Sequence, residues 1–178
     1  QDFTYLAESE ARIETPLGDA RLTLEREAPS HFDLIAVDAF SSDAIPVHLI
    51  TSEALALYTK HVKPGGVIAF HVTNRFLDPV PVVQALATAH QMEAVWIHDP
   101  GADVLANRTD WVLVSTNREL LAQPRIADAA TPIRSPTDGR RFAHDFNNLF
   151  RVAHQSWRGD CAAIERRSKP RQYPWWEN

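Results

Sequence analysis

The residues best suited to chemistry lie in an acidic, hydroxyl-rich loop that follows a short apolar run. Asp38 comes directly after the apolar residues 34–37, and Asp43 follows a pair of serines in the same loop. Apolar runs without polar alternation are typical of strands buried on both faces in helix-covered parallel sheets. Ligands of such sheets bind beyond the carboxyl ends of the strands. Asp38 is therefore the first candidate for a catalytic carboxylate and Asp43 the second, although such residues also cap helices or form simple turns.

Several familiar site motifs are absent from the sequence. The histidines form no H-E-x-x-H pattern and no close pair with carboxylates at the spacing of metal ligands, so we expect no metal site. Ser41 and Ser42 lie outside any G-x-S-x-G elbow, which argues against a hydrolase. His48 and His71 are interpreted as structural residues, because a lone histidine more often satisfies a local hydrogen bond than serves a site.

Strands and helices alternate along the first 115 residues. The pattern predicts strands over residues 12–17, 32–37, 67–72, 94–97 and 111–115, and helices over residues 20–28, 52–61 and 80–90. This alternation is typical of an α/β fold with a mostly parallel sheet. The last two strands are joined by a loop too short for a helical crossover, so we expect them to form an antiparallel pair at one edge.

The expected glycine-rich turn of a nucleotide-binding α/β domain is missing. The chain contains only 6 glycines and no G-x-G-x-x-G motif. Either the fold does not need this turn, or the chain is the later part of a longer protein, truncated at its N-terminal side; we expect the second. Residues 122–141 are rich in Pro, Ala, Thr and Asp and are interpreted as a surface excursion.

Composition and charge narrow the class of protein. The chain has 178 residues, of which 44% are hydrophobic and 23% charged, as expected for a globular domain. Residues 1–130 hold 9 basic and 18 acidic side chains, whereas residues 131–178 hold 9 and 5. The acidic body disfavours nucleic acid and favours cationic small molecules. One cysteine, Cys161, and the absence of a signal or membrane-spanning segment make the cytoplasm the default location.

Several short motifs, in order, resemble the polyamine aminopropyltransferases, the spermidine synthase family. They are found at residues 18–20, 38–43, 45–49, 63–66 and 71–74, and residues 145–149 are similar to a terminal element of the same family. The resemblance is greatest to a bacterial branch in which this domain follows a membrane-embedded region. It implies a Rossmann-like fold of the class I methyltransferase type, occupying residues 1–120. Residues 121–178 would then form an extension that packs on the domain, and a homodimer is a further expectation.

The resemblance also implies roles for individual residues. Asp19 and Ala20 would contact the adenine of decarboxylated S-adenosylmethionine or methylthioadenosine, and Pro46 would pack on the base. Asp38 would be the catalytic aspartate. The family loop has the form Asp-x-x-Asp-Pro, whereas Asp43 lies two residues later than that pattern places its second carboxylate. These nucleosides are co-substrate and product, and no tightly bound cofactor is expected.

Aminopropyl transfer is chemically compatible with a site built from carboxylates. The sulfonium leaving group is already activated by its charge, so the enzyme has to align and deprotonate an amine. An alkylammonium group has a pKa of about 10.4, and a carboxylate can both bind it and accept or relay its proton. Alignment alone can account for roughly 7–11 kcal/mol of the barrier. Two alternatives stay open: an S-adenosylmethionine-dependent methyltransferase, and a non-catalytic sensing or assembly domain of a membrane protein. We expect the isolated chain to be inactive.

Overall fold

The computed structural model of the chain describes residues 4, 6–39, 46–74, 77–101 and 108–133. The candidate Asp43, the segment 145–149 and most of the predicted C-terminal extension lie outside these residues. The predicted division at residue 120 therefore stays a prediction. None of the helices in the described ranges has the length and apolar character needed to cross a bilayer.

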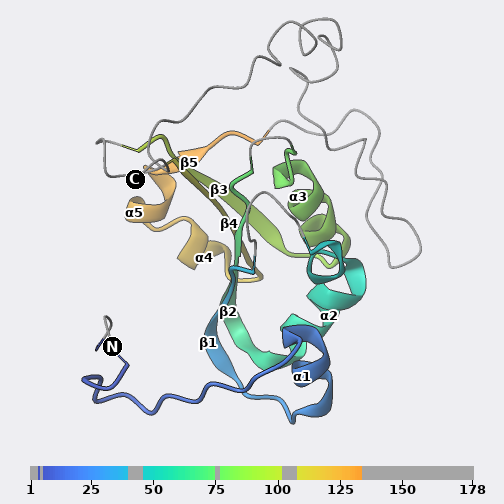
Figure 1. Cartoon of the computed structure of the whole chain (residues 1–178). Coiled ribbons are helices and arrows are strands. Elements are labelled where there is room, and N and C mark those ends of the chain that lie inside the picture. The colour runs from blue at the N-terminus through green and yellow to red at the C-terminus, as the bar shows by residue number, and fades with distance from the viewer. Residues whose placement is uncertain (1–3, 5, 40–45, 75–76, 102–107, 134–178) are drawn as a thin grey trace, which may run out of the picture.

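One mixed sheet is formed by the strands of the described residues, in the order β1-β2-β4-β3-β5 (Figure 1). The strands are β1 (Phe32–Val37), β2 (Val62–His71), β3 (Glu93–Asp99), β4 (Thr109–Ser115) and β5 (Ala130–Thr131). β1 and β2 pair in parallel, whereas β4 pairs antiparallel with both β2 and β3, and β5 antiparallel with β3. The sheet is therefore mostly antiparallel, and the prediction of a mostly parallel sheet is wrong.

The position of β4 explains this difference. The predicted antiparallel pairing of β3 and β4 is confirmed, but β4 does not lie at the edge, because it is inserted between β2 and β3. Both of these neighbours run opposite to β4, so β1, β2 and β3 all point the same way. The carboxyl ends of these three strands and the amino end of β4 consequently meet at one edge of the sheet. We call it the carboxyl edge.

The helices flank the sheet on two sides (Figure 1). α1 (Ala20–Arg26), α2 (Ser52–His61) and α3 (Val80–Ala89) lie on one side, and the short α4 (Arg118–Leu121) and α5 (Pro124–Ala127) on the other. A 3-10 turn, η1 (Val47–Leu49), precedes α2. The predicted helices are confirmed to within a few residues. α4, α5 and β5 lie in or beside the segment that was interpreted as a surface excursion, and they were not predicted.

Local sequence signals account for where the helices begin. The Thr51 side chain accepts a hydrogen bond from the backbone N–H of Ala54 at 3.2 Å and so caps α2. α3 begins with prolines at its first turn, where a missing N–H costs little. α1 is capped by Asp19, one of the candidate site residues.

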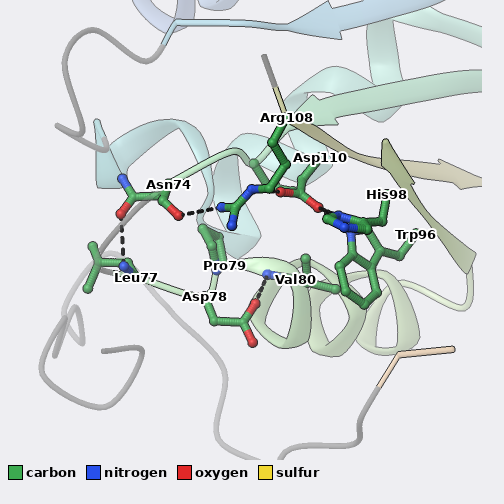
Figure 2. Close-up of a pocket in the computed structure, with 10 residues that line it drawn as sticks. Asn74, Leu77, Asp78, Pro79, Val80, Trp96, His98, Arg108 and Asp110 are labelled. Carbon is green, nitrogen blue, oxygen red and sulfur yellow. Dashed lines mark hydrogen bonds and ion pairs between the residues drawn. The ribbon is translucent and has the colours of Figure 1, made fainter. Parts of the chain in front are cut away.

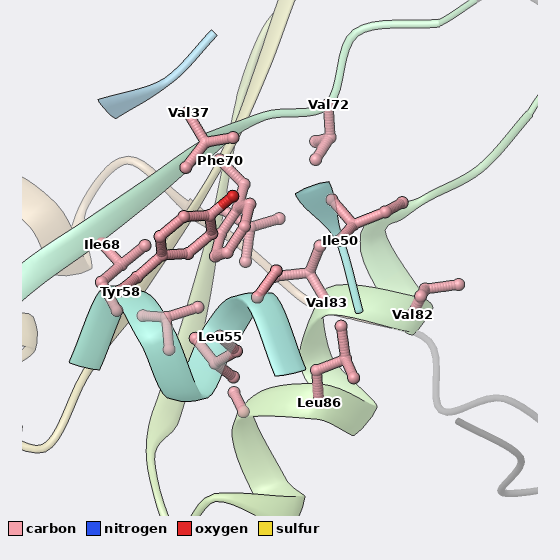
Figure 3. Packing of buried hydrophobic residues seen from close by; sticks show 14 of the residues in the cluster. Val37, Ile50, Leu55, Tyr58, Ile68, Phe70, Val72, Val82, Val83 and Leu86 are labelled. Carbon is pink, nitrogen blue, oxygen red and sulfur yellow. The ribbon is translucent and has the colours of Figure 1, made fainter. Parts of the chain in front are cut away.

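The hydrophobic core lies between the sheet and the helices α2 and α3 (Figure 3). Phe70 of β2 and Tyr58 of α2 pack with ring centroids 6.1 Å apart, inclined at 56°. The largest fully buried apolar side chains are Phe70, Leu55, Ile68, Leu86, Val83, Val112 and Val114. Packing in this core fixes the strands whose ends form the carboxyl edge.

β1 differs from its prediction as a strand buried on both faces. Leu34 is 56% exposed and Phe32 is also exposed, whereas Val37 is buried. Within the described residues β1 has one neighbouring strand, β2, and this leaves much of its surface uncovered. The strand predicted over residues 12–17 is likewise wrong, since this segment forms no ladder with the sheet.

The pairing of β1 with β2 contains an irregularity at the Lys63-Pro64-Gly65-Gly66 segment. Phe32 pairs with Val62 and Leu34 with Val67, so the residues between Val62 and Val67 are extra on the β2 side. A Cβ atom on Gly66 would lie 2.7 Å from Val62 Cγ2 and 2.8 Å from the Asp33 carbonyl oxygen. Only glycine fits this close backbone approach.

We predict that Gly66→Ala destabilises the protein by about 1–3 kcal/mol, because the added methyl group overpacks against backbone. The matched control is Lys63→Ala in the same segment. Lys63 pairs with the exposed Asp33 at 2.7 Å, and such surface pairs contribute less than about 1 kcal/mol. Urea unfolding followed by circular dichroism measures both variants. Equal midpoints for Gly66→Ala and Lys63→Ala would contradict the close approach.

A second prediction concerns Tyr58, whose hydroxyl donates to the Leu49 carbonyl at 3.1 Å. Burial raises the pKa of the Tyr58 phenol to about 12, against an opposing effect of Arg21 and with a smaller contribution from Asp19. Between pH 10 and 12 the unfolded chain releases this proton and the folded chain keeps it, so the free energy of unfolding falls as pH rises.

Tyr58→Phe should therefore be less stable than wild type by about 1 kcal/mol at neutral pH, where the lost hydrogen bond dominates. Above pH 10 the gap should close and reverse, because wild type loses up to about 2–3 kcal/mol that the variant does not. Chemical unfolding of both proteins at several pH values tests this. A gap that stays constant with pH would refute the raised pKa.

Candidate functional site

Asp38 and His71 form a hydrogen-bonded pair at the carboxyl edge of the sheet. Asp38 follows β1, and His71 is the last residue of the neighbouring strand β2. The His71 Nδ1 atom lies 2.7 Å from Asp38 Oδ1. The Asp38 side chain is 54% exposed and that of His71 is 24% exposed. Parallel pairing of β1 and β2 brings these two residues together, and it leaves part of the carboxylate open to solvent.

A chain of hydrogen bonds continues from His71 into the sheet. Its Nε2 atom lies 2.7 Å from the Thr73 hydroxyl and 3.3 Å from the Thr109 hydroxyl. The Thr73 oxygen in turn accepts the backbone N–H of Asp110 at 2.7 Å. The Thr73 hydroxyl therefore has its own proton available to donate to His71. These contacts link Asp38 at the surface to β4 in the interior of the sheet.

The partners of His71 define its neutral tautomer. An ionised carboxylate only accepts hydrogen bonds, so the nitrogen facing Asp38 has to carry the proton. The other nitrogen then holds the lone pair that accepts from Thr73. The imidazole ring also stacks on Trp111, with centroids 4.8 Å apart and planes inclined at 25°. Trp111 lies directly opposite His71 in the β2–β4 register, so the ring is held from its face as well as its edges.

Asp19 has a different environment, at the start of α1. Its Oδ1 accepts the backbone N–H of Leu22 at 3.0 Å, and its Oδ2 lies 3.2 Å from His48 Nε2. The Leu22 N–H is the main cause that lowers the pKa of the Asp19 carboxyl, and the charge of His48 adds to it against a partial desolvation effect. Both oxygens are thus engaged within the chain. The carboxylate acts as a helix cap and as the partner of His48.

Ala20 and Pro46 lie beside this cap. Ala20 is the first residue of α1, and Pro46 directly precedes η1, where its carbonyl accepts the N–H of Leu49 at 2.9 Å. His48 belongs to η1, so its contact with Asp19 joins the two segments that carry the three residues of the predicted nucleoside site. Their predicted contact with adenine stays a prediction.

Asp110 is the centre of a second polar cluster at the same edge. Its carboxylate is 8% exposed and accepts from Trp96 Nε1 at 3.1 Å and His98 Nδ1 at 2.6 Å, while Arg108 Nε lies 3.2 Å away. Arg108 also donates to the Asn74 carbonyl at 2.9 Å. Burial of a carboxylate is costly unless it is paired and hydrogen-bonded, and these partners meet that requirement.

A small cavity opens beside the Asp110 cluster (Figure 2). Its volume is about 140 Å³. Polar side chains line one part of it and apolar ones the rest: Val72, Asn74, Leu77, Asp78, Pro79, Val80, Trp96, His98, Arg108 and Asp110. Within the described ranges, no group of three or more His, Cys, Asp or Glu side chains could hold a metal ion.

Sequence reasoning singled out Asp38 but not the cluster that supports it. His71 was interpreted as a structural residue, and Thr73, His98 and Asp110 were not considered. The signal that could have found the cluster was the predicted antiparallel pairing of β3 with β4. That pairing places His98 directly opposite Asp110. A histidine at the end of one strand and an aspartate at the start of the next then face each other across the ladder.

The fold and site together define an α/β protein with a mixed sheet and a carboxylate–histidine pair at its carboxyl edge. No family model matches the chain, and no curated protein matches it. Among solved structures, a probable spermidine synthase from Corynebacterium glutamicum is similar, with a TM-score of 0.43 and 20% sequence identity. The similarity covers 56% of this chain and 36% of that protein, so the chain spans little more than a third of its length. This distant likeness assigns no activity.

The two carboxylates of the edge should differ in their effect on stability. Asp110→Ala removes the common partner of three side chains, and we expect it to lower the free energy of unfolding by about 2–4 kcal/mol. Asp38→Ala breaks a half-exposed pair and should cost less than about 1 kcal/mol. Thermal and urea unfolding measure both. A loss at Asp38 as large as that at Asp110 would show that Asp38 is a structural residue.

Proposed function

We propose that this chain carries the amine-activating part of a spermidine-synthase-like transferase. The reaction is the transfer of an aminopropyl group from decarboxylated S-adenosylmethionine to a polyamine-type amine. The observation that supports it is the Asp38 carboxylate at the carboxyl edge. One of its oxygens bonds to His71, and the described part of the chain makes no hydrogen bond to the other. A half-exposed carboxylate of this kind is suited to bind an ammonium group.

The proposed step involves one proton and one carbon–sulfur bond. The bound ammonium gives a proton to Asp38, so an N–H bond breaks and an O–H bond forms. The freed nitrogen lone pair attacks the aminopropyl carbon that is bonded to the sulfonium sulfur. The electron pair of that C–S bond leaves on the sulfur. The products are the extended amine and methylthioadenosine. Asp38 serves as general base, and the rigid end of β1 provides the alignment.

The donor nucleoside is assigned to Asp19, Ala20 and Pro46, and Asp43 is a second candidate for binding the amine. The contact between Asp19 and His48 supports a common location for the nucleoside residues. A carboxylate oxygen has two lone pairs, so Asp19 can accept an adenine amino group in addition to its present partners.

A second candidate is a non-catalytic ligand-binding domain. The observation that favours it is the engagement of both Asp19 oxygens within the chain, one as the cap of α1 and the other as the partner of His48, which gives Asp19 a structural role without any nucleoside. In that case amines could still bind at Asp38 without any transfer.

Calorimetric titration with putrescine and spermidine tests the proposal on the protein. We expect wild type to bind the amines and Asp38→Asn to weaken binding about 10- to 100-fold, because a charge-assisted hydrogen bond is lost. The matched control is Asp33→Asn on the same strand, whose side chain is 85% exposed and pairs with Lys63. It should bind like wild type. Absence of amine binding by wild type, or equal effects of the two substitutions, would overturn the assignment of Asp38.

Binding of nucleosides distinguishes aminopropyl transfer from methyl transfer and from a non-catalytic domain. In the presence of the amine, preference for methylthioadenosine over S-adenosylhomocysteine supports aminopropyl transfer, and the opposite preference supports methyl transfer. Release of methylthioadenosine from decarboxylated S-adenosylmethionine, followed by mass spectrometry, reads out transfer directly, and turnover by this chain alone would contradict the expectation that it is inactive. Amine binding with no affinity for either nucleoside would favour the non-catalytic domain.

A further inference from the structure

We propose that His71 is a positioning residue for Asp38: its Nδ1–H holds one carboxylate oxygen so that the other is presented to the substrate ammonium. This inference rests on the proposed function and adds a residue to it. The 2.7 Å contact uses Asp38 Oδ1 alone, and the half-exposed side chain leaves Oδ2 for an incoming group. An exposed carboxylate at the end of a strand can rotate about its side-chain bonds unless a hydrogen bond restrains it. His71 provides this hydrogen bond.

The hydrogen bond from His71 to Asp38 depends on which nitrogen of His71 carries the proton. If the Nδ1 atom lost its proton, its lone pair would face the Asp38 carboxylate and repel it. The Asp38 carboxylate only accepts, which keeps the proton on Nδ1, and the Thr73 hydroxyl lies 2.7 Å from Nε2, where it is placed to donate to the lone pair. Thr73 is itself oriented by the backbone N–H of Asp110 at 2.7 Å. The amide N–H uses one lone pair of the Thr73 oxygen and leaves the hydroxyl proton for His71, while the Asp38 carboxylate, which only accepts, sets the direction of the relay from the other end.

The ring itself is immobilised by its surroundings. Trp111 stacks against its face at 4.8 Å, and the Thr109 hydroxyl lies 3.3 Å from Nε2. Asp110 is anchored in turn, because its carbonyl accepts the Val72 N–H at 2.8 Å and its carboxylate is held by β3. The relay therefore runs from the interior of the sheet to the surface through side chains that are held by several contacts each.

The arrangement also matters for the proton-transfer step. Before the step, the His71 N–H stabilises the ionised carboxylate that attracts the ammonium. During the step, the proton moves from the ammonium nitrogen to Asp38 Oδ2, and the hydrogen bond from His71 to Oδ1 is kept. His71 neither gains nor loses a proton. It acts through Asp38 and makes no contact with the substrate.

The first test measures the tautomer of His71 in the wild-type protein. Nitrogen-15 NMR of the histidine side chains distinguishes a ring protonated on Nδ1 from one protonated on Nε2, and His71→Asn identifies the signal. We expect the neutral His71 ring to carry its proton on Nδ1. Thr73→Ser should keep this state, and Thr73→Val should lose it. An Nε2-protonated ring in wild type would overturn the inference and leave the proposed role of Asp38 standing.

The second test compares three replacements of His71 by calorimetric titration with spermidine. The Asn side chain places an N–H donor near the position of Nδ1, whereas Gln places it near Nε2, and Leu has none. We expect His71→Asn to bind within a few-fold of wild type. His71→Gln and His71→Leu should each weaken binding about 10- to 100-fold. A purely structural role predicts that binding follows the unfolding midpoint instead of the donor position.

The outcomes separate the two proposals. Spermidine binding by wild type together with unchanged affinity in His71→Leu would overturn the positioning role while the function of Asp38 stands. The same holds if His71→Asn and His71→Gln lose affinity equally. If wild type binds no spermidine at all, the proposed function fails, and the role of His71 fails with it.

Discussion

The arrangement of the carboxyl edge depends on the buried Asp110. Its carboxylate takes hydrogen bonds from Trp96 and His98 of β3, its backbone N–H donates to Thr73, and its carbonyl accepts from Val72. One residue thus connects β3, β4 and the end of β2. A buried charge is tolerated only with such partners, so the requirement to satisfy Asp110 fixes the positions of the groups around it.

The same constraint links the interior to the proposed site. Insertion of β4 between β2 and β3 brings Asp110 beside Thr73, and Thr73 leads to His71 and then to Asp38. Without an antiparallel strand at this place, no backbone N–H would lie in position to orient the relay. A chain of hydrogen bonds therefore connects a backbone amide inside the sheet to the half-exposed carboxylate of Asp38.

Asp19 and Asp38 show how one residue type takes two roles in the same fold. Asp19 accepts the N–H of Leu22 at the start of α1, and this bond holds its pKa below the usual value for an aspartate. Asp38 follows a strand, caps no helix of the described chain and has a histidine as its partner. Asp19 therefore serves the local structure first, whereas Asp38 retains the freedom to bind another molecule.

The sequence by itself determined the α/β class, the three helices beside the core and the antiparallel pairing of β3 with β4. These features follow from local periodicity, capping residues and loop length, which act over a few neighbouring residues. It also singled out Asp38 from its place after an apolar run. Only the tertiary structure decided the insertion of β4 between β2 and β3, the exposure of β1 and the relay through His71. Each of these features depends on which strands become neighbours. Burial of apolar side chains over the whole sheet decides that order, and the sequence of a single segment contains little information about it.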